Sequence, residues 1–297
     1  MGSGITFCFL GALSFGLLGS VSKVAERRKC NASVIVVSCC GCAALFMLTR
    51  TLSIGNGFSL PSKVVWVAIP FGICAAVAFL AFQRSIAIGK VAVGWLVMNL
   101  SAGVPAVVSI WIYKERLTWL KSVAFALALV SLWFLFKGAG TERSESEPAA
   151  NKKGIWSGLW ALLMLIILVT NGMSAFGLKI IAAWGLSQSV TFPYLTVWYA
   201  AGFLCISGLL FFNRSKMGWE DFVWGAAIAA LSIGGQVSMG KALAASVPGN
   251  IVFPVAMGGS LLVVVLAGRW VFGERMSWLS ASGVLLGTSA VLLLSVS

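Results

Sequence analysis

The sequence predicts an all-α integral membrane protein with ten transmembrane helices, arranged as two inverted five-helix repeats. Its 297 residues are 60% hydrophobic and only 10% charged, a composition more apolar than that of soluble globular domains. Long apolar segments fill most of the chain, and each is close to the roughly 20 residues that a helix needs to cross a bilayer. An eight-residue pattern also occurs twice, which indicates an internal duplication.

Ten apolar segments follow one another along the chain. No basic stretch precedes the first one, as it would in a cleavable signal peptide, so we expect this segment to remain as a helix. The ten segments cover residues 4–22, 31–49, 64–83, 91–113, 118–136, 155–178, 188–212, 221–241, 249–272 and 277–296. The loops between them are too short to form a separate soluble domain.

The duplicated pattern lies at the turn before the last helix of each half. Tyr113-Lys-Glu-Arg-Leu-Thr-Trp-Leu120 matches Phe272-Gly-Glu-Arg-Met-Ser-Trp-Leu279, which comes 159 residues later. The same offset aligns Val91–Ile112 with Asn250–Val271, and an offset of 156 aligns Leu13–Lys23 with Val169–Lys179. The chain is therefore expected to divide into a first repeat (1–137), a polar linker (138–153) and a second repeat (154–297).

Helix-breaking residues occur at corresponding places in the fourth and ninth segments. Pro105 interrupts the fourth segment, while Pro254 and Gly259 interrupt the ninth. A proline inside a helix frees a backbone carbonyl, which a membrane tolerates only beside protein or a water-lined cavity. Because broken helices in two halves mark the binding site of many transporters, we expect a cavity near the midplane here.

Polar, aromatic and small residues near these breaks are expected to line the cavity. An amide deep inside a span must find a partner or water. For Asn99 and Gln236, interhelical hydrogen bonding and cavity lining both stay open. The predicted cavity residues are Trp95, Asn99, Ala102, Asn171, Trp198, Gln236, Asn250, Pro254 and Gly258.

Charged residues and cysteines argue against several other classes of protein. The net charge of +13 comes from lysines and arginines near span ends, where they can reach phospholipid headgroups, so nucleic acid is not an expected partner. The chain has no histidine, and its seven cysteines lack the spacing of zinc sites or disulfide scaffolds. No metal, cofactor or enzymatic activity is therefore predicted. The charged residues expected to orient the two repeated turns are Glu115, Arg116, Glu274 and Arg275.

Three features of the chain suggest a family: the duplicated unit, the turns Lys114–Thr118 and Gly273–Ser277, and the small-residue helices before these turns. In these features the chain resembles the drug/metabolite transporter superfamily, in particular its ten-helix EamA-type members. The resemblance covers essentially the whole chain. It implies inverted halves around a central cavity, and export or exchange of small metabolites across the bacterial inner (plasma) membrane. One departure concerns the small multidrug members, which couple protons to cation export through a carboxylate in the first helix. Residues 4–22 contain no Asp or Glu, which disfavours export of organic cations by that route.

We expect a transporter, an exporter or exchanger of small polar metabolites such as amino-acid-like solutes, that works by alternating access around a midplane cavity. A neutral, zwitterionic or anionic solute fits a site without a buried carboxylate better than an organic cation does. Two alternatives stay open: uptake of sugars or sugar derivatives, and a structural or receptor-like membrane protein that transports nothing. The expected partners are the substrate and the lipid bilayer, and the oligomeric state is left open, a monomer included.

The distribution of lysine and arginine predicts how the chain is oriented. With ten spans both termini lie on one side, and the loops on the other side hold 14 of the 21 basic residues. Because basic loops stay in the cytoplasm, the charge count predicts termini outside it, whereas the family resemblance implies cytoplasmic termini. A C-terminal reporter that is active only in the cytoplasm should therefore be silent. An active reporter would contradict the charge-based prediction.

Overall fold

In the computed structural model, all regular structure of the described residues is helical, which confirms the predicted all-α class. An apolar segment in lipid satisfies its own backbone hydrogen bonds only as a helix. The structure describes residues 2–53, 60–101, 104, 108, 112, 118–146, 155–184, 186–212, 217–245, 254–273 and 277–296. The helices are α1 (Gly2–Arg27), α2 (Ala32–Ser53), α3 (Ser62–Ile88), α4 (Val91–Leu100), α6 (Trp119–Ser146), α7 (Ile155–Ala183), α8 (Ser187–Phe212), α9 (Trp219–Ala244), the π-helical turn η2 (Pro254–Gly258), α11 (Gly259–Trp270) and α12 (Trp278–Val296).

Five helices of the described chain are long and apolar enough to cross a membrane. They run over Gly4–Arg27, Ala32–Ser53, Ser62–Ile88, Val190–Phe212 and Trp219–Met239. Large apolar side chains are also exposed: Trp66 is 78%, Phe211 82% and Trp278 90% accessible. Such exposure is unfavourable in water and ordinary in lipid. Together these features are those of an integral membrane protein.

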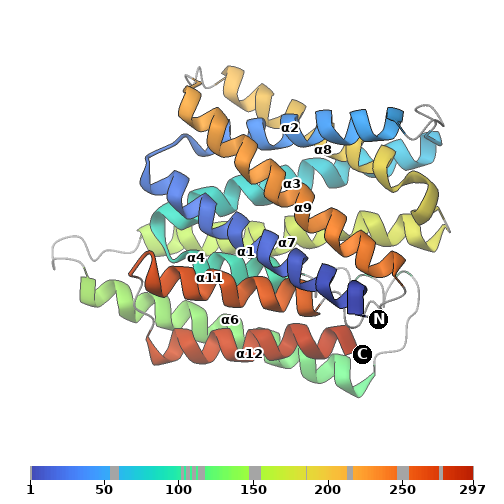
Figure 1. Ribbon diagram of the computed structural model, residues 1–297. Helices are drawn as coiled ribbons and strands as arrows, with labels where there is room; N and C mark the ends of the chain where they lie inside the picture. Colours follow the sequence, from blue (N-terminus) through green and yellow to red (C-terminus); the bar gives the residue numbers. More distant parts are fainter. Residues whose placement is uncertain are drawn as a thin grey trace.

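The helices lie side by side in one bundle, with the two chain ends at the same end of it (Figure 1). α2 packs on α8, α3 packs on α7 and α8, α1 packs on α9, and α6 packs on α12. α4 and α11 contact each other and α1. A continuous core of buried apolar side chains runs through most of the bundle and includes Ile35, Phe82, Leu96, Ile167 and Tyr194.

The turn between α1 and α2 is tied to the second half of the chain by polar contacts. The Arg27 guanidinium donates a hydrogen bond to the carbonyl oxygen of Phe272 at 2.5 Å and lies 4.8 Å from the centre of its ring. The backbone N–H of Asn31 donates to the carboxylate of Asp221 in α9 at 2.9 Å. The turn is thereby fixed to α9 and to the end of α11, at the end of the bundle opposite the chain termini (Figure 1).

Two helices extend beyond the apolar segments from which they were predicted. α3 continues past residue 83 to Ile88, and α6 continues past residue 136 to Ser146. Residues 138–146 of the expected linker are therefore helical, and 147–153 lie outside the described residues. Charged residues end a hydropathy segment but not a helix, because Glu, Lys and Arg are good helix formers.

α3 and α8 approach each other closely at Gly72. A Cβ added to this residue would lie against the backbone of Trp198, with the carbonyl carbon 2.8 Å away. Small residues at such crossings allow membrane helices to pack backbone to backbone. Gly72 therefore sets how near α8 can come to α3.

Gly72→Ala should lower the free energy of unfolding by about 1–3 kcal/mol, because the added methyl group forces two backbones apart. Gly208→Ala in α8 is the matched control, since an added Cβ meets nothing within 4 Å there and alanine favours a helix. Thermal unfolding in detergent, followed by tryptophan fluorescence, measures both variants. Equal melting temperatures would contradict the close packing of α3 on α8.

Candidate functional site

α4 is a short helix that is buried on almost all sides. From Val91 to Leu100, only Met98 is not fully buried. A helix that is apolar all round belongs in the interior of a bundle, and α4 contacts α1, α3, α6, α7, α11 and α12. Side chains on α4 therefore reach elements of both halves of the chain.

The indole of Trp95 joins α4 to α11. Its Nε1 donates a hydrogen bond to Ser260 Oγ at 3.0 Å, and Ser260 Oγ donates to the carbonyl oxygen of Met257 at 2.7 Å. Met257 belongs to η2, and π-helical turns of this kind occur frequently at functional sites. The Trp95 ring also packs edge-on against Phe82 of α3, with 5.5 Å between ring centres. Trp95 is thus held by α3 and α11 at once.

A second group of hydrogen bonds joins the end of α4 to α7. The Asn171 amide donates to the carbonyl oxygen of Met98 at 3.0 Å and to Ser101 Oγ at 2.6 Å, and Ser101 Oγ donates to the same carbonyl at 2.5 Å. Within α4 itself, the Asn99 amide donates to the carbonyl oxygen of Trp95, one turn earlier in the helix, at 3.1 Å. The last carbonyl groups of a helix have no partner within it. Asn171 and Ser101 supply partners for one of them.

Gly258 ends η2 beside open space. The residue is buried, yet a Cβ added to it would meet no atom of the described residues within 4 Å. The next residue differs, because a Cβ on Gly259 would lie 2.9 Å from the Cβ of Ala12 in α1. Space beside a glycine lets another molecule approach the backbone closely. Space for the side of a small ligand is therefore present beside Gly258, two residues before Ser260.

The other predicted site residues lie away from α4 or outside the described residues. Trp198 is on α8, where its ring meets Tyr199 edge-on with 4.7 Å between centres. Gln236 is a half-buried residue of α9, which packs mainly on α1 and α2. The side chain of Pro254 and residues Ala102, Pro105, Glu115, Arg116, Asn250, Glu274 and Arg275 lie outside what the structure describes.

Two serines that accept the buried hydrogen bonds were missed by the sequence reasoning. Ser101 and Ser260 are 159 residues apart, the offset of the predicted repeat, and each follows a methionine by three residues. Serine changes the hydropathy of a span very little, so neither residue stood out. Because the two serines occupy the same position in the aligned repeats, the alignment could have identified them.

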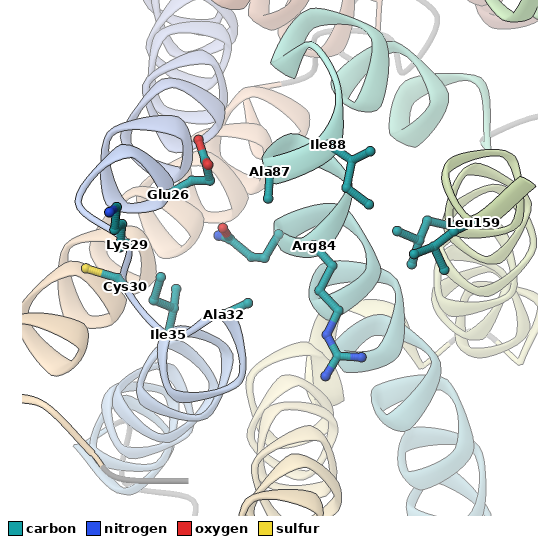
Figure 2. A pocket seen from close by; sticks show the side chains of 11 residues that line it. Glu26, Lys29, Cys30, Ala32, Ile35, Arg84, Ala87, Ile88 and Leu159 are labelled. Atoms are coloured by element: carbon teal, nitrogen blue, oxygen red, sulfur yellow. The ribbon is translucent and has the colours of Figure 1, made fainter. Parts of the chain in front are cut away.

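A cavity that the sequence did not predict lies at the end of the bundle opposite the chain termini (Figures 1 and 2). Its volume is about 480 Å³, and its walls come from the ends of α1 and α3, the α1–α2 turn, the first turn of α2, and the second and third turns of α7. The lining residues are Glu26, Lys29, Cys30, Ala32, Ile35, Gln83, Arg84, Ala87, Ile88, Leu159 and Leu163. An apolar groove of about 630 Å³ lies between α2, α3 and α8.

Cys30 is the thiol in the wall of this cavity. Burial raises its pKa to about 11, and the Asp221 carboxylate adds to the rise through its negative charge and a hydrogen bond from the thiol. The thiol is therefore protonated near neutral pH. Within the described residues, no three His, Cys, Asp or Glu side chains gather to hold a metal ion.

Comparisons with known proteins show the fold and no family. No family model matches the chain, and no curated protein matches it. A solved structure described only as "Crystal structure of protein" is similar over 97% of this chain and 97% of its own, with a TM-score of 0.55 and 16% sequence identity. At this identity the similarity concerns the fold alone, and it extends over nearly the whole of both chains.

The Cys30 thiol should react with N-ethylmaleimide near pH 7.5 on the order of 100-fold more slowly than an exposed thiol, because only the thiolate reacts and each pKa unit changes its amount tenfold. The rate should rise as the pH approaches 11. Asp221→Asn removes a group that raises the pKa, so labelling near pH 8 should become faster. Mass spectrometry of the Cys30 peptide measures this, and equal rates in the parent and the variant would argue against the contact with Asp221.

Proposed function

We propose that the protein is a ten-span transporter of the drug/metabolite transporter type, built from two inverted five-helix repeats, which exports or exchanges small polar solutes by alternating access. The pattern of helix packing supports the repeat. In the proposed repeat, α1, α3 and α4 of the first half correspond to α7, α9 and α11 of the second. The α3–α7 contact then corresponds to the α9–α1 contact, and the α4–α7 contact to the α11–α1 contact. All four contacts occur. α2 corresponds to α8 and α6 to α12, and each of these pairs of equivalent helices is also in contact.

Contacts at aligned positions support the same relation between the halves. The two offsets pair Gly16 with Gly172 and Ser101 with Ser260. A Cβ on Gly16 would lie 3.0 Å from the carbonyl oxygen of Ser260, and one on Gly172 would lie 2.6 Å from that of Ser101. Each serine also donates its hydroxyl to the carbonyl of the methionine three residues earlier. The same kind of helix crossing thus occurs twice, each time between a glycine of one half and a serine of the other.

The observation that carries the transport proposal is a line of polar side chains in the interior, around α4. This polar seam consists of Trp95, Asn99, Ser101, Asn171 and Ser260. It joins α4 to α7 and α11, next to the open space at Gly258. Polar groups at this depth bond neighbouring helices and mark solute pathways. A neutral, zwitterionic or anionic solute fits best, because no Asp or Glu is buried among the described residues.

Counterflow into proteoliposomes tests this function. Vesicles loaded with one unlabelled metabolite should take up its labelled form, over a panel of amino acids, sugars and small organic acids. Saturable counterflow of an amino-acid-like solute is the expected result, and sugar counterflow would favour the sugar-transport alternative. Counterflow of no solute would favour a membrane protein that transports nothing.

Changes in the polar seam should weaken transport of the solute so identified. Asn99→Ala should lower the affinity for this solute several-fold, because it removes a hydrogen bond between the Asn99 amide and the solute that is worth about 0.5–1.5 kcal/mol net. Gly258→Leu should reduce transport more strongly, because it fills the open space beside η2. Leu285→Ala on α12 is the control, since this side chain is 70% exposed and should leave transport unchanged.

Size-exclusion chromatography confirms that each variant is folded before transport is measured. If Asn99→Ala and Gly258→Leu both transport with the parent's kinetics, the solute does not bind at the polar seam.

A further inference from the structure

The cavity at the end of the bundle has a polar side and an apolar side. Figure 2 shows Glu26 and Lys29 on one side and Ile88 and Leu159 on the other, and the Arg84 side chain extends below both groups in this view. Gln83, which is only 3% exposed, lies next to Arg84 and donates a hydrogen bond to Ser22 Oγ at 2.9 Å. A molecule in this cavity would therefore meet charged groups at one part of its surface and aliphatic side chains at another.

The charges in the cavity wall do not cancel. Glu26 is already paired with Lys23, whose Nζ lies 3.0 Å from the carboxylate and also donates to the carbonyl oxygen of Ile86 at 2.6 Å. Lys29 and Arg84 form no ion pair with any residue that the structure describes. The wall thus carries an excess of positive charge, and such a hollow attracts anions.

Acidic residues of α9 lie outside the lining of the cavity. Asp221 faces Cys30, and its two carboxylate oxygens accept hydrogen bonds from the backbone N–H groups of Asn31 at 2.9 Å and Gly218 at 3.1 Å. Glu220 also acts on Cys30 by its charge but is exposed in the first turn of α9. Asp221 is thereby held by the backbone, which leaves Lys29 and Arg84 to an outside ligand.

Lys29 occupies a backbone conformation that lysine rarely adopts. Its φ of 59° is the left-handed position that ends α1, where the N–H of Cys30 bonds to the carbonyl of Ala25 at 3.1 Å. Glycine is the usual residue there, and the turn after α11 does use one, Gly273, with a φ of 67°. A strained residue at the edge of a cavity points to a use for its side chain.

We propose that this cavity binds an anionic group, a phosphate or a carboxylate, through Arg84 and Lys29. The aliphatic wall receives the rest of the molecule, so the ligand is an amphipathic anion. A guanidinium presents several donors in a fork that fits the oxygens of these groups. Two sources offer this chemistry: a soluble organic anion, and the headgroup of an anionic phospholipid whose chain lies along α7. The site is separate from the polar seam and does not depend on transport.

Thermal unfolding of the full-length protein in nanodiscs tests this site. The probes are inorganic phosphate and hexyl phosphate in phosphatidylcholine discs, and phosphatidylglycerol in place of part of the phosphatidylcholine. The variant Arg84→Gln removes one cation, and the double variant adds Lys29→Asn, because asparagine tolerates the left-handed backbone. Arg269→Gln is the matched control, since it removes an exposed arginine of α11 that does not line the cavity.

A bound anion stabilises the folded state and should raise the melting temperature by several degrees in the parent and in Arg269→Gln. The rise should shrink in Arg84→Gln and vanish in the double variant. A rise with hexyl phosphate identifies a soluble anion as the source, and a rise with phosphatidylglycerol alone identifies a lipid headgroup.

The proposal is overturned if no probe shifts the parent, or if the double variant keeps the full shift. It is also overturned if Arg269→Gln loses as much of the shift as Arg84→Gln, because net charge alone would then explain the result. The unfolding experiment measures binding and does not require transport, so its result can be interpreted even if the counterflow experiment fails. If the double variant does not fold, the Arg84→Gln variant decides the test: a smaller rise in melting temperature supports the proposal, and an undiminished rise overturns it.

Discussion

Two close helix crossings organise the centre of this bundle, and each places a glycine against a serine carbonyl. α1 meets α11 at Gly16 and Ser260, and α7 meets α4 at Gly172 and Ser101. Lipid chains are as apolar as leucine, so apolar side chains alone do not draw membrane helices together. Close backbone contact and hydrogen bonds do. The glycines bring the backbones near, and the serine hydroxyls accept hydrogen bonds from Trp95 of α4 and Asn171 of α7.

The polar seam lies next to these crossings, because both serines belong to it. Trp95 of α4 donates to Ser260 of α11, and Asn171 of α7 donates to Ser101 at the end of α4. A donor left without its acceptor in this interior would cost about 1–3 kcal/mol, which opposes sliding of α4 along either neighbour. Beside this bonded region, Gly258 faces open space. The centre is thus fixed where it is hydrogen-bonded and has unfilled space at η2, which fits the proposed solute site.

Hydropathy predicted the all-α class and the place of several helices, and it said nothing of their contacts. Segments 31–49 and 188–212 fall on α2 and α8 because a bilayer selects apolar runs of one length. The helical residues after 83 and 136 were missed because they lie beyond the apolar runs. Trp95 and Asn171 were predicted because indole and amide groups are conspicuous in a span. Their serine partners were not, and the cavity was not, since its lining comes from segments that only the tertiary fold brings together.

The α1–α2 turn connects the two regions to which functions are proposed. Arg27 and Asn31 of this turn hold the end of α11 and α9, and Lys29 between them faces the cavity. Hydrogen bonds to charged groups contribute about 1.5–3 kcal/mol each, so any opening of the bundle at this end must offset both of these contacts. α11 also carries Ser260, the acceptor for Trp95. An anion bound at Lys29 would therefore act on the turn that Arg27 ties to the end of α11, and under the proposed transport function that is where a ligand could alter the balance between closed and open ends.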